Sequence, residues 1–411
     1  MKRGPTEFNP WELATGLENA DSLPFCRGTP DKVRVPCNAA HGNDRLGSVG
    51  SVKLTWRKGQ PGFHVFDFMK TLRSLVFPRT GCADHSLNDR CKRKKTMLKS
   101  CVKQIAGCLC VVMLGYSIWA GEEVKAEDSF SVVLLPDTQN YAQKFPDTYV
   151  AQTLWIREHR KENNIKFAIH LGDIVQTPTN RTEWENADRA MRLLDGVVPY
   201  SVAPGNHDMV VKDRDSSLYN QFFSPARFAK RPWYGGHMDK NNDNNFCLFD
   251  ACGMKFMIIN LEFAPRDETL KWATGVAQRH PDHRIIVATH CYMRPKSRDT
   301  GCATSYNIAG NSGEQIWQKL IRKQPNIFLV VSGHVLGVGL QTSTNDAGGK
   351  VLEMLTDYQG LPNGGDGWLR TLTFVPKENK INVKTYSPLL DQENKDEKET
   401  FSMNYSMTSV K

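Results

Sequence analysis

Residues 197–208 read VVPYSVAPGNHD, an apolar run that stops at Pro204 and continues into the polar tetrad Gly205-Asn206-His207-Asp208. The run predicts a buried strand, and the proline and glycine that follow predict its end. A strand that stops here delivers the amide oxygen of Asn206 and the imidazole of His207 together to one edge of a sheet. By itself the tetrad is also typical of an ordinary turn.

Four further apolar runs end in residue types that bind metals. They lead into Asp137, Gly172-Asp173, His290 and Gly333-His334. Open α/β sheets bind ligands beyond the carboxyl ends of their strands, so we expect these strand ends to converge on one site. Taken singly, each residue is more typical of a helix cap or a buried histidine, but the whole set in this order indicates a metal centre.

The order of the predicted elements indicates an α/β protein with two mixed sheets. Strands and helices alternate between residues 131 and 332, whereas residues 341–386 contain short strands separated by Gly and Asn turns. This change favours a two-sheet architecture over a simple doubly wound sheet. The predicted strands are 132–135, 167–171, 198–202, 246–249, 255–260, 285–289, 327–332, 351–356, 369–374 and 381–386, and the predicted helices are 146–162, one beginning near Thr182, 267–280 and 313–324.

The candidate residues match the chemistry of phosphoester hydrolysis. Attack on phosphorus needs a hydroxide at neutral pH and compensation for negative charge in the transition state, and two divalent metals about 3.5–4 Å apart supply both. Their ligands are carboxylate, imidazole and amide oxygen, with one carboxylate bridging. Side chains of these types stand at Asp137, Asp173, Asn206, His290 and His334.

The chain resembles the calcineurin-like metallophosphoesterases in five short motifs, which occur in the family's order. The motifs are Asp137-Thr138-Gln139, Gly172-Asp173, Gly205-Asn206-His207-Asp208, Thr289-His290 and Gly333-His334, and they span half of the chain. The resemblance implies a four-layer α/β/β/α sandwich, in which helices face two mixed β-sheets and the metals lie at the strand ends. It also implies two divalent metal ions (Mn, Fe, Zn or Mg) and hydrolysis of a phosphomonoester or phosphodiester by in-line attack of metal-bound hydroxide.

The second metal site is complete when the family's ligands are carried over to this chain. By resemblance, Asp173 bridges the two metals, and Asn206, His290 and His334 complete the second site. His207 is implied to face the substrate phosphate and to donate a proton to the leaving oxygen. Asp208 either orients His207 or caps a helix.

The first metal site departs from the family pattern. By resemblance, Asp137 binds the first metal, but the family's histidine two residues later is replaced by Gln139, whose carbonyl oxygen remains a candidate ligand. A second expected histidine is replaced by Leu336. We therefore expect a weaker or differently selective first site that favours a hard cation such as Mn²⁺ or Mg²⁺.

Two function classes follow from this pattern. The first is a metal-dependent phosphoesterase, whose substrate stays open among monoesters, diesters, nucleotides and phospholipid head groups, because specificity lies in loops such as 212–245. The alternative is a catalytically inactive metal-binding surface or interaction protein on the same scaffold, which lost turnover with the histidines of the first site. The intact second-site residues argue against this alternative.

The N-terminal residues are expected to lie outside the catalytic domain. Residues 1–96 carry 17 Lys and Arg against 9 Asp and Glu, whereas the rest of the chain carries 36 against 35. Because residues 1–96 lack sustained periodicity, we predict a disordered or spurious extension, and we expect no nucleic-acid partner. The phosphoesterase domain is expected at 127–390, before a polar, disordered tail at 391–411.

Residues 97–126 have the layout of a signal peptide, with 15 uncharged, mostly apolar residues after a basic segment. This layout predicts a secreted, periplasmic or cell-surface protein without a stable membrane span. A signal anchor, or a basic tail before a buried core helix, are the alternatives.

Beyond residue 126 the chain has four cysteines, Cys247, Cys252, Cys291 and Cys302. They lack the CxxC spacing of a metal site. Two alternatives stay open: disulfides in any of three connectivities, or unpaired buried thiols. Cys291 is not expected to bind the metal of His290, because neighbouring strand residues point to opposite faces.

Overall fold

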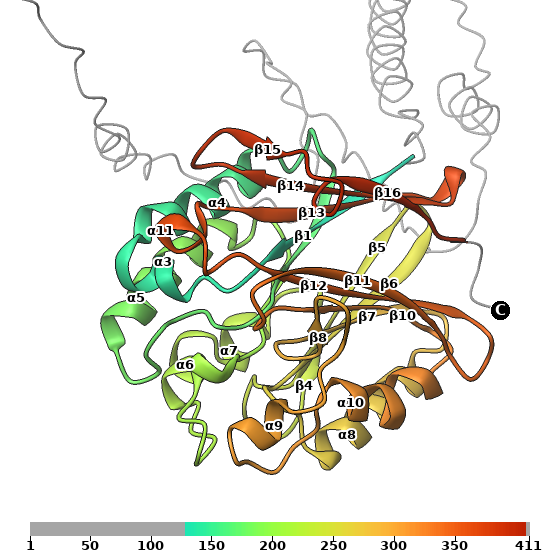
Figure 1. Cartoon of the computed structure of the whole chain (residues 1–411), viewed down its shortest axis with the longest axis horizontal. Helices are drawn as coiled ribbons and strands as arrows, with labels where there is room; N and C mark the ends of the chain where they lie inside the picture. The colour runs from blue at the N-terminus through green and yellow to red at the C-terminus, as the bar shows by residue number, and fades with distance from the viewer. Residues whose placement is uncertain (1–127, 408–411) are drawn as a thin grey trace, which may run out of the picture. The chain divides into compact units, whose positions relative to one another are not determined.

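The computed structural model of the protein describes residues 128–407 (Figure 1). The predictions for residues 1–96 and for the signal-like segment 97–126 lie outside the described residues. Within residues 128–407, two seven-stranded sheets form the centre of the fold, and both contain parallel and antiparallel strands. Across the same range, no helix is both long enough and apolar enough to cross a membrane.

The first sheet contains β1 (Phe130–Leu135), β2 (Ile165–His170), β3 (Tyr200–Ser201), β13 (Leu369–Val375), β14 (Lys380–Ser387), β15 (Gln392–Asn394) and β16 (Phe401–Asn404). Its order is β15-β14-β13-β1-β2-β3, and β16 also pairs with β14. Strand β3 is shorter than the predicted strand 198–202. Pro199 has no N–H to donate to the ladder, although its carbonyl oxygen accepts from the Ala168 N–H at 2.9 Å.

The second sheet contains β4 (Tyr234–His237), β5 (Asn245–Ala251), β6 (Met254–Leu261), β7 (Arg284–Thr289), β10 (Ile327–Ser332), β11 (Gly337–Thr344) and β12 (Lys350–Asp357). Its order is β11-β12-β10-β7-β6-β5-β4. The central strands β6, β7, β10 and β12 are parallel, so their carboxyl ends share one edge. A separate small hairpin pairs β8 (Met293–Arg294) with β9 (Ser297–Arg298).

Apolar residues fill the space between the two sheets. Val132 and Leu134 of the first sheet and Ile258 and Ile286 of the second belong to one buried cluster. Val133, between the first two, instead faces the helices on the outer side of its sheet. This alternation follows from the two-residue period of a strand and lets each sheet bury both faces.

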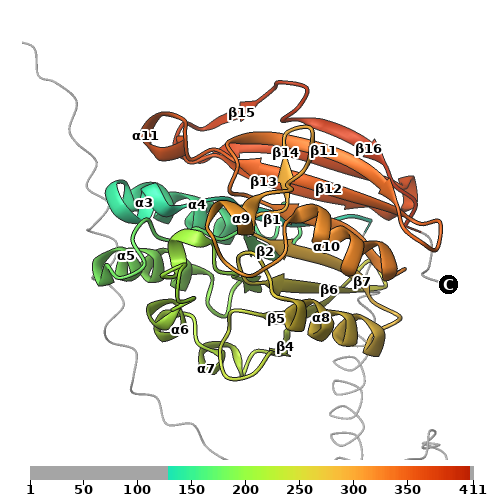
Figure 2. The same ribbon diagram turned by 60° about the horizontal axis from the view of Figure 1, so that its bottom comes forward.

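Helices cover the outer face of each sheet (Figures 1 and 2). The helices are α3 (Gln139–Lys144), α4 (Pro146–Glu158), α5 (Arg181–Met191), α6 (Ser217–Phe222), α7 (Pro225–Phe228), α8 (Asp267–Arg279), α9 (Cys302–Ser305), α10 (Gly313–Lys319) and α11 (Pro362–Gly365). Tyr149 of α4 and Trp184 of α5 pack on the first sheet. Val276 of α8 and Ile316 of α10 pack on the second. The predicted α/β/β/α sandwich is therefore confirmed.

The prediction of a disordered tail after residue 390 is wrong for residues 392–407. Strands β15 and β16 both pair with β14, and Phe401 lies opposite Val383. Tyr405 and Met407 are buried in the cluster between the sheets. Apolar side chains at every second position from Phe401 bury one face of the segment, although its overall composition is polar.

Candidate metal centre

The carboxyl ends of β1, β2, β7 and β10 bring the predicted carboxylate and imidazole ligands together. The Nε2 atom of His290 lies 3.2 Å from Oδ2 of Asp173 and 3.9 Å from Oδ1 of Asp137. Nδ1 of His334 lies 3.3 Å from the same Nε2 atom. The His334 backbone N–H donates to Oδ1 of Asp137 at 3.0 Å. Four residues that are far apart in the sequence thus share one buried location.

Gln139, Asn206 and His207 complete the predicted group. The Gln139 side-chain amide donates to Oδ2 of Asp173 at 3.1 Å. The His207 backbone N–H donates to Oδ1 of Asp173 at 2.9 Å, and Asn206 precedes it in a single 3₁₀ turn, Asn206–Asp208. All seven predicted site residues therefore lie at the same edge of the sandwich.

Glycines next to the candidate ligands allow the backbone segments to approach closely. A Cβ atom on Gly205 would lie 2.1 Å from Oδ1 of Asp173, and one on Gly333 would lie 2.1 Å from Oδ2 of Asp137. The two aspartates adopt positive φ angles, +39° at Asp137 and +51° at Asp173. Strained backbone of this kind is concentrated at functional sites, where the surrounding structure holds it in place.

The His290 imidazole is held by both of its ring nitrogens. Nδ1 donates to the Leu171 carbonyl oxygen at 2.9 Å, so Nε2 faces the carboxylates. Burial alone would lower the pKa of His290, but the charge and hydrogen bond of Asp173 raise it to about 10. Burial alone would raise the pKa of Asp173, but the charge and hydrogen bond of His290 lower it to about 2. A metal cation that binds this pair would release the imidazole proton.

Three oxygens at the site are buried and lack a hydrogen-bond partner. They are Oδ2 of Asp137, Oε1 of Gln139 and Oδ1 of Asn206. An unsatisfied buried polar atom costs about 1–3 kcal/mol, and carboxylate and amide oxygens are the ligands that hard divalent cations prefer. Asp173, His290 and His334 add ligand atoms that all lie within 4.8 Å of one another. This donor set fits divalent metal ions.

The His207 side chain is oriented by a loop and not by its neighbour Asp208. Its Nδ1 atom donates to the Gln176 carbonyl oxygen at 2.7 Å, which leaves Nε2 for other partners. The Asp208 carboxylate instead accepts backbone N–H groups from Ile174 at 2.8 Å and from Gly205 at 2.8 Å. Asp208 therefore ties the Asp173 loop to the Asn206 turn.

Comparison with known families identifies the chain. The model of the calcineurin-like phosphoesterases matches residues 130–337, about half of the chain. The chain belongs to the calcineurin-like phosphoesterase family. The uncharacterized protein YvnB of Bacillus subtilis (strain 168) is 35% identical over 286 residues, which cover 67% of this chain and 21% of YvnB. This phosphoesterase thus spans about a fifth of the length of that relative.

Two solved structures are similar to this chain at low sequence identity. The purple acid phosphatase PPD1 of yellow lupin covers 69% of this chain, with 55% of PPD1 covered, at 12% identity and a TM-score of 0.45. GAP50, the anchor in the inner membrane complex of Plasmodium, also covers 69% of this chain, with 90% of GAP50 covered, at 13% identity and a TM-score of 0.40.

Sequence reasoning missed Asp357 and Gln359 at the site of this phosphoesterase. Asp357 ends β12 and is buried, and the Gln359 side chain accepts a hydrogen bond from the side-chain amide of Gln139. Burial holds the pKa of Asp137 well above its usual range, and the charge of Asp357 adds more to this effect than that of Asp173. The signal was available, because residues 351–356 form a sixth apolar run that ends in a ligand type.

A buried histidine that is not among the predicted site residues contacts the loops that carry two of the ligands. His170 lies at the end of β2 with its side chain fully buried. Its Nδ1 atom accepts the Gly172 N–H at 3.2 Å, and Nε2 lies 2.9 Å from Oγ1 of Thr138. His170 therefore connects the two loops that carry Asp137 and Asp173.

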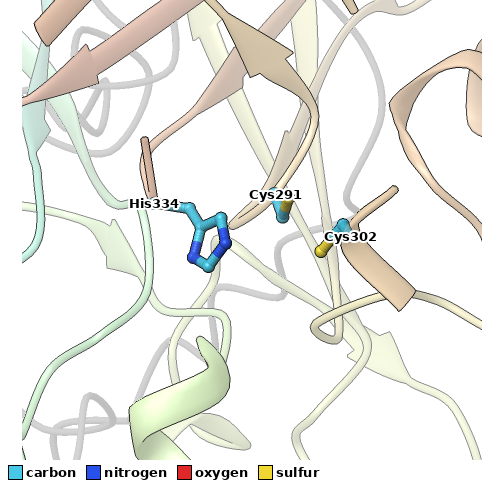
Figure 3. A group of neighbouring side chains, drawn as sticks. All are labelled: Cys291, Cys302 and His334. Carbon is cyan, nitrogen blue, oxygen red and sulfur yellow. The ribbon is translucent and has the colours of Figure 1, made fainter. Parts of the chain in front are cut away.

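Two cysteines, Cys291 and Cys302, lie close to His334 (Figure 3). Cys291 and Cys302 each have a sulfur within 4.8 Å of one ring nitrogen of His334. The four cysteines of the described part are thiols, so the disulfide alternatives are not adopted in this structure. A hydrogen bond with Cys302, together with burial, raises the pKa of the Cys291 thiol. Cys291 and Cys302 thus lie next to each other beside His334.

Proposed function

We propose that this chain is a metal-dependent phosphoesterase that hydrolyses a phosphomonoester or phosphodiester by in-line attack. The observation that carries the proposal is the set of buried, unpartnered oxygens on Asp137, Gln139 and Asn206. They surround the Asp173–His290 pair. Two bound divalent cations would supply a water-derived nucleophile at neutral pH and would offset the negative charge that develops on the phosphoryl group.

The candidate ligands fall into two sets, one for each metal. Asp173 accepts the His207 N–H with one carboxylate oxygen and faces His290 with the other, so it would be shared by both sites. Asn206, His290 and His334 would hold the second metal. Asp137 and the oxygen of Gln139 would hold the first.

We assign protonation of the leaving oxygen to His207. Its Nδ1–H is occupied by the Gln176 carbonyl oxygen, so only Nε2 is available to face a substrate. A donor held in one orientation can transfer its proton without first losing rotational freedom, which is the condition for effective general acid catalysis. The His207 backbone, bonded to Asp173, fixes this imidazole next to the metals.

A catalytically inactive metal-binding protein is the second candidate. The replacement of two family histidines by Gln139 and Leu336 favours it, because both losses weaken the first site. Such a protein would bind metal at His290 and His334 and would not turn over phosphate esters.

The test uses the purified full-length chain, stripped with chelator and reloaded with Mn²⁺. We expect bound metal by mass spectrometry and hydrolysis of p-nitrophenyl phosphate or bis(p-nitrophenyl) phosphate. His207→Gln should keep the metal and lower kcat by about 10²–10⁴-fold. The matched control, His283→Gln, changes a histidine that is bonded to Asp282 beyond the end of α8 and should keep full activity. Bound metal without turnover would support the inactive protein, and a chain that binds no metal would contradict both candidates.

We also propose that the chain is exported, on the basis of the signal-like residues 97–126. Peptide mapping of the mature N-terminus tests this proposal. A start near residue 121 or 127 is expected, and a mature protein that retains residues 97–126 inside the cell would refute it.

A further inference from the structure

We propose that Asp357 is a ligand of the first metal, in place of a histidine that the family provides and this chain lacks. The inference rests on the proposed function and names a residue that none of the five family motifs contains. It would make the first site an all-oxygen site formed by Asp137, Asp173, Asp357 and the Gln139 side chain.

The sheet register places Asp357 beside the known part of the site. Strands β10 and β12 are parallel neighbours, and Ser332 lies opposite Leu355. Strand β10 ends there and turns into Gly333-His334, while β12 continues two residues further to Asp357, so both segments lie at the same edge of the sheet. The His334 N–H is bonded to Asp137 at this level, and the Asp357 side chain is buried, with 1% exposure.

A continuous hydrogen-bonded chain connects Asp357 to the bridging carboxylate. The Gln359 backbone N–H donates to Oδ1 of Asp357 at 2.9 Å, and its side-chain amide donates to Oδ2 at 3.0 Å. The Gln359 side-chain oxygen accepts from the amide of Gln139, which also donates to Oδ2 of Asp173 at 3.1 Å. Two amide side chains thus span the distance between the carboxylates of Asp357 and Asp173.

Carboxylates are concentrated at this location. Of all charged groups, Asp357 acts most strongly on Asp137, more strongly than His290, whose Nε2 lies 3.9 Å from Oδ1 of Asp137. The carboxylates of Asp137, Asp173 and Asp357 thus act on one another in a site that also holds the imidazoles of His290 and His334. In addition, Oδ2 of Asp137 and Oε1 of Gln139 are buried without partners and supply an independent sign of a missing ligand.

Leu336, which stands at the position of the lost histidine, has no side-chain atom that can bind a metal. Leu336 is 58% exposed and packs against Gly360, next to Gln359. A carboxylate from the neighbouring strand compensates for the missing imidazole and changes the chemistry of the site. Oxygen ligands select Mn²⁺ or Mg²⁺, whereas the second site keeps two imidazoles and suits Zn²⁺ or Fe²⁺ as well.

The experiment measures metal binding and not only turnover. Full-length wild type, Asp357→Asn and Asp357→Ala are stripped and titrated with Mn²⁺ by calorimetry, and bound manganese is counted. Wild type should bind two ions with an exchange-coupled electron paramagnetic resonance signal. Asp357→Ala should weaken the first site by at least about 100-fold and leave a mononuclear signal, since even residues behind the ligands contribute 10–100-fold.

The controls separate this inference from the proposed function. Asp366→Asn makes the same change at a loop carboxylate bonded to Asn363 and should bind like wild type. Asp357→Asn keeps groups that can bond to Gln359, so it should fold even if the alanine variant does not. Two tightly bound, coupled ions in Asp357→Asn and Asp357→Ala would overturn the inference and leave the function intact. A wild type that binds no Mn²⁺ would overturn both.

Discussion

Replacement of His170 should make the fold less sensitive to acid. The wild-type ring fits its surroundings only when it is neutral, because Nδ1 accepts the Gly172 N–H. Thr138 donates its hydroxyl hydrogen to the Ile174 carbonyl oxygen, so Nε2–H of His170 donates to Thr138. A second ring proton would point at the Gly172 N–H. Burial, followed by the charge of His290, lowers the pKa of His170 to about 3.

The size of the effect follows from proton linkage. An unfolded histidine has a pKa of about 6.5, so below this pH the unfolded chain binds a proton that the folded chain takes up only near pH 3. The contribution is present above pH 6.5 and is lost as the pH falls. At pH 5 the loss is about 2 kcal/mol, since one pH unit corresponds to about 1.4 kcal/mol.

Urea unfolding of the chelator-treated full-length chain at pH 8 and pH 5 measures this difference. His170→Asn and His170→Gln should each lower the free energy of unfolding at pH 8 by about 1–3 kcal/mol, because buried hydrogen bonds are lost. Their further loss between pH 8 and pH 5 should be about 2 kcal/mol smaller than that of wild type. His237→Gln, at an exposed position, serves as control. If both His170 variants lose as much stability as wild type on acidification, the neutral buried state of His170 is wrong.

Three further outcomes are expected. Leu336→His should restore an imidazole to the first site and tighten Mn²⁺ binding by about 10-fold in calorimetry, and an unchanged affinity would contradict the assignment of that position. Gly333→Ala should lower the free energy of unfolding by about 1–3 kcal/mol, because the new methyl group would lie 2.1 Å from Oδ2 of Asp137. The same change at Gly275 in α8 should instead stabilise the fold by about 0.5–1 kcal/mol, and equal effects in urea unfolding would refute this contrast. Peptide mapping after brief alkylation should find half-buried Cys252 modified first, and faster labelling of any of the buried thiols Cys247, Cys291 and Cys302 would contradict the structure.

Local sequence patterns were sufficient to predict most of the elements that carry the site. Strands β1, β2, β7 and β10 were each found as apolar runs, and each leads into a candidate ligand. Residues 351–356 also lead into a ligand type, Asp357, although Glu353 interrupts their apolar pattern. The tail strand β16 was missed because its polar residues dominated the composition and concealed the alternation from Phe401 to Met407.

The family, the two-sheet architecture and the types of ligand residue follow from the sequence, because they depend on local periodicity and on the order of short motifs. Which groups act on one another depends on the packed fold. Asp208 supports two loops, His170 is kept neutral beneath the site, and Asp357 acts on Asp137 from 220 residues away in the chain. Such contacts depend on strand register and on burial from water, which arise when the two sheets pack and cannot be read from any single stretch of residues.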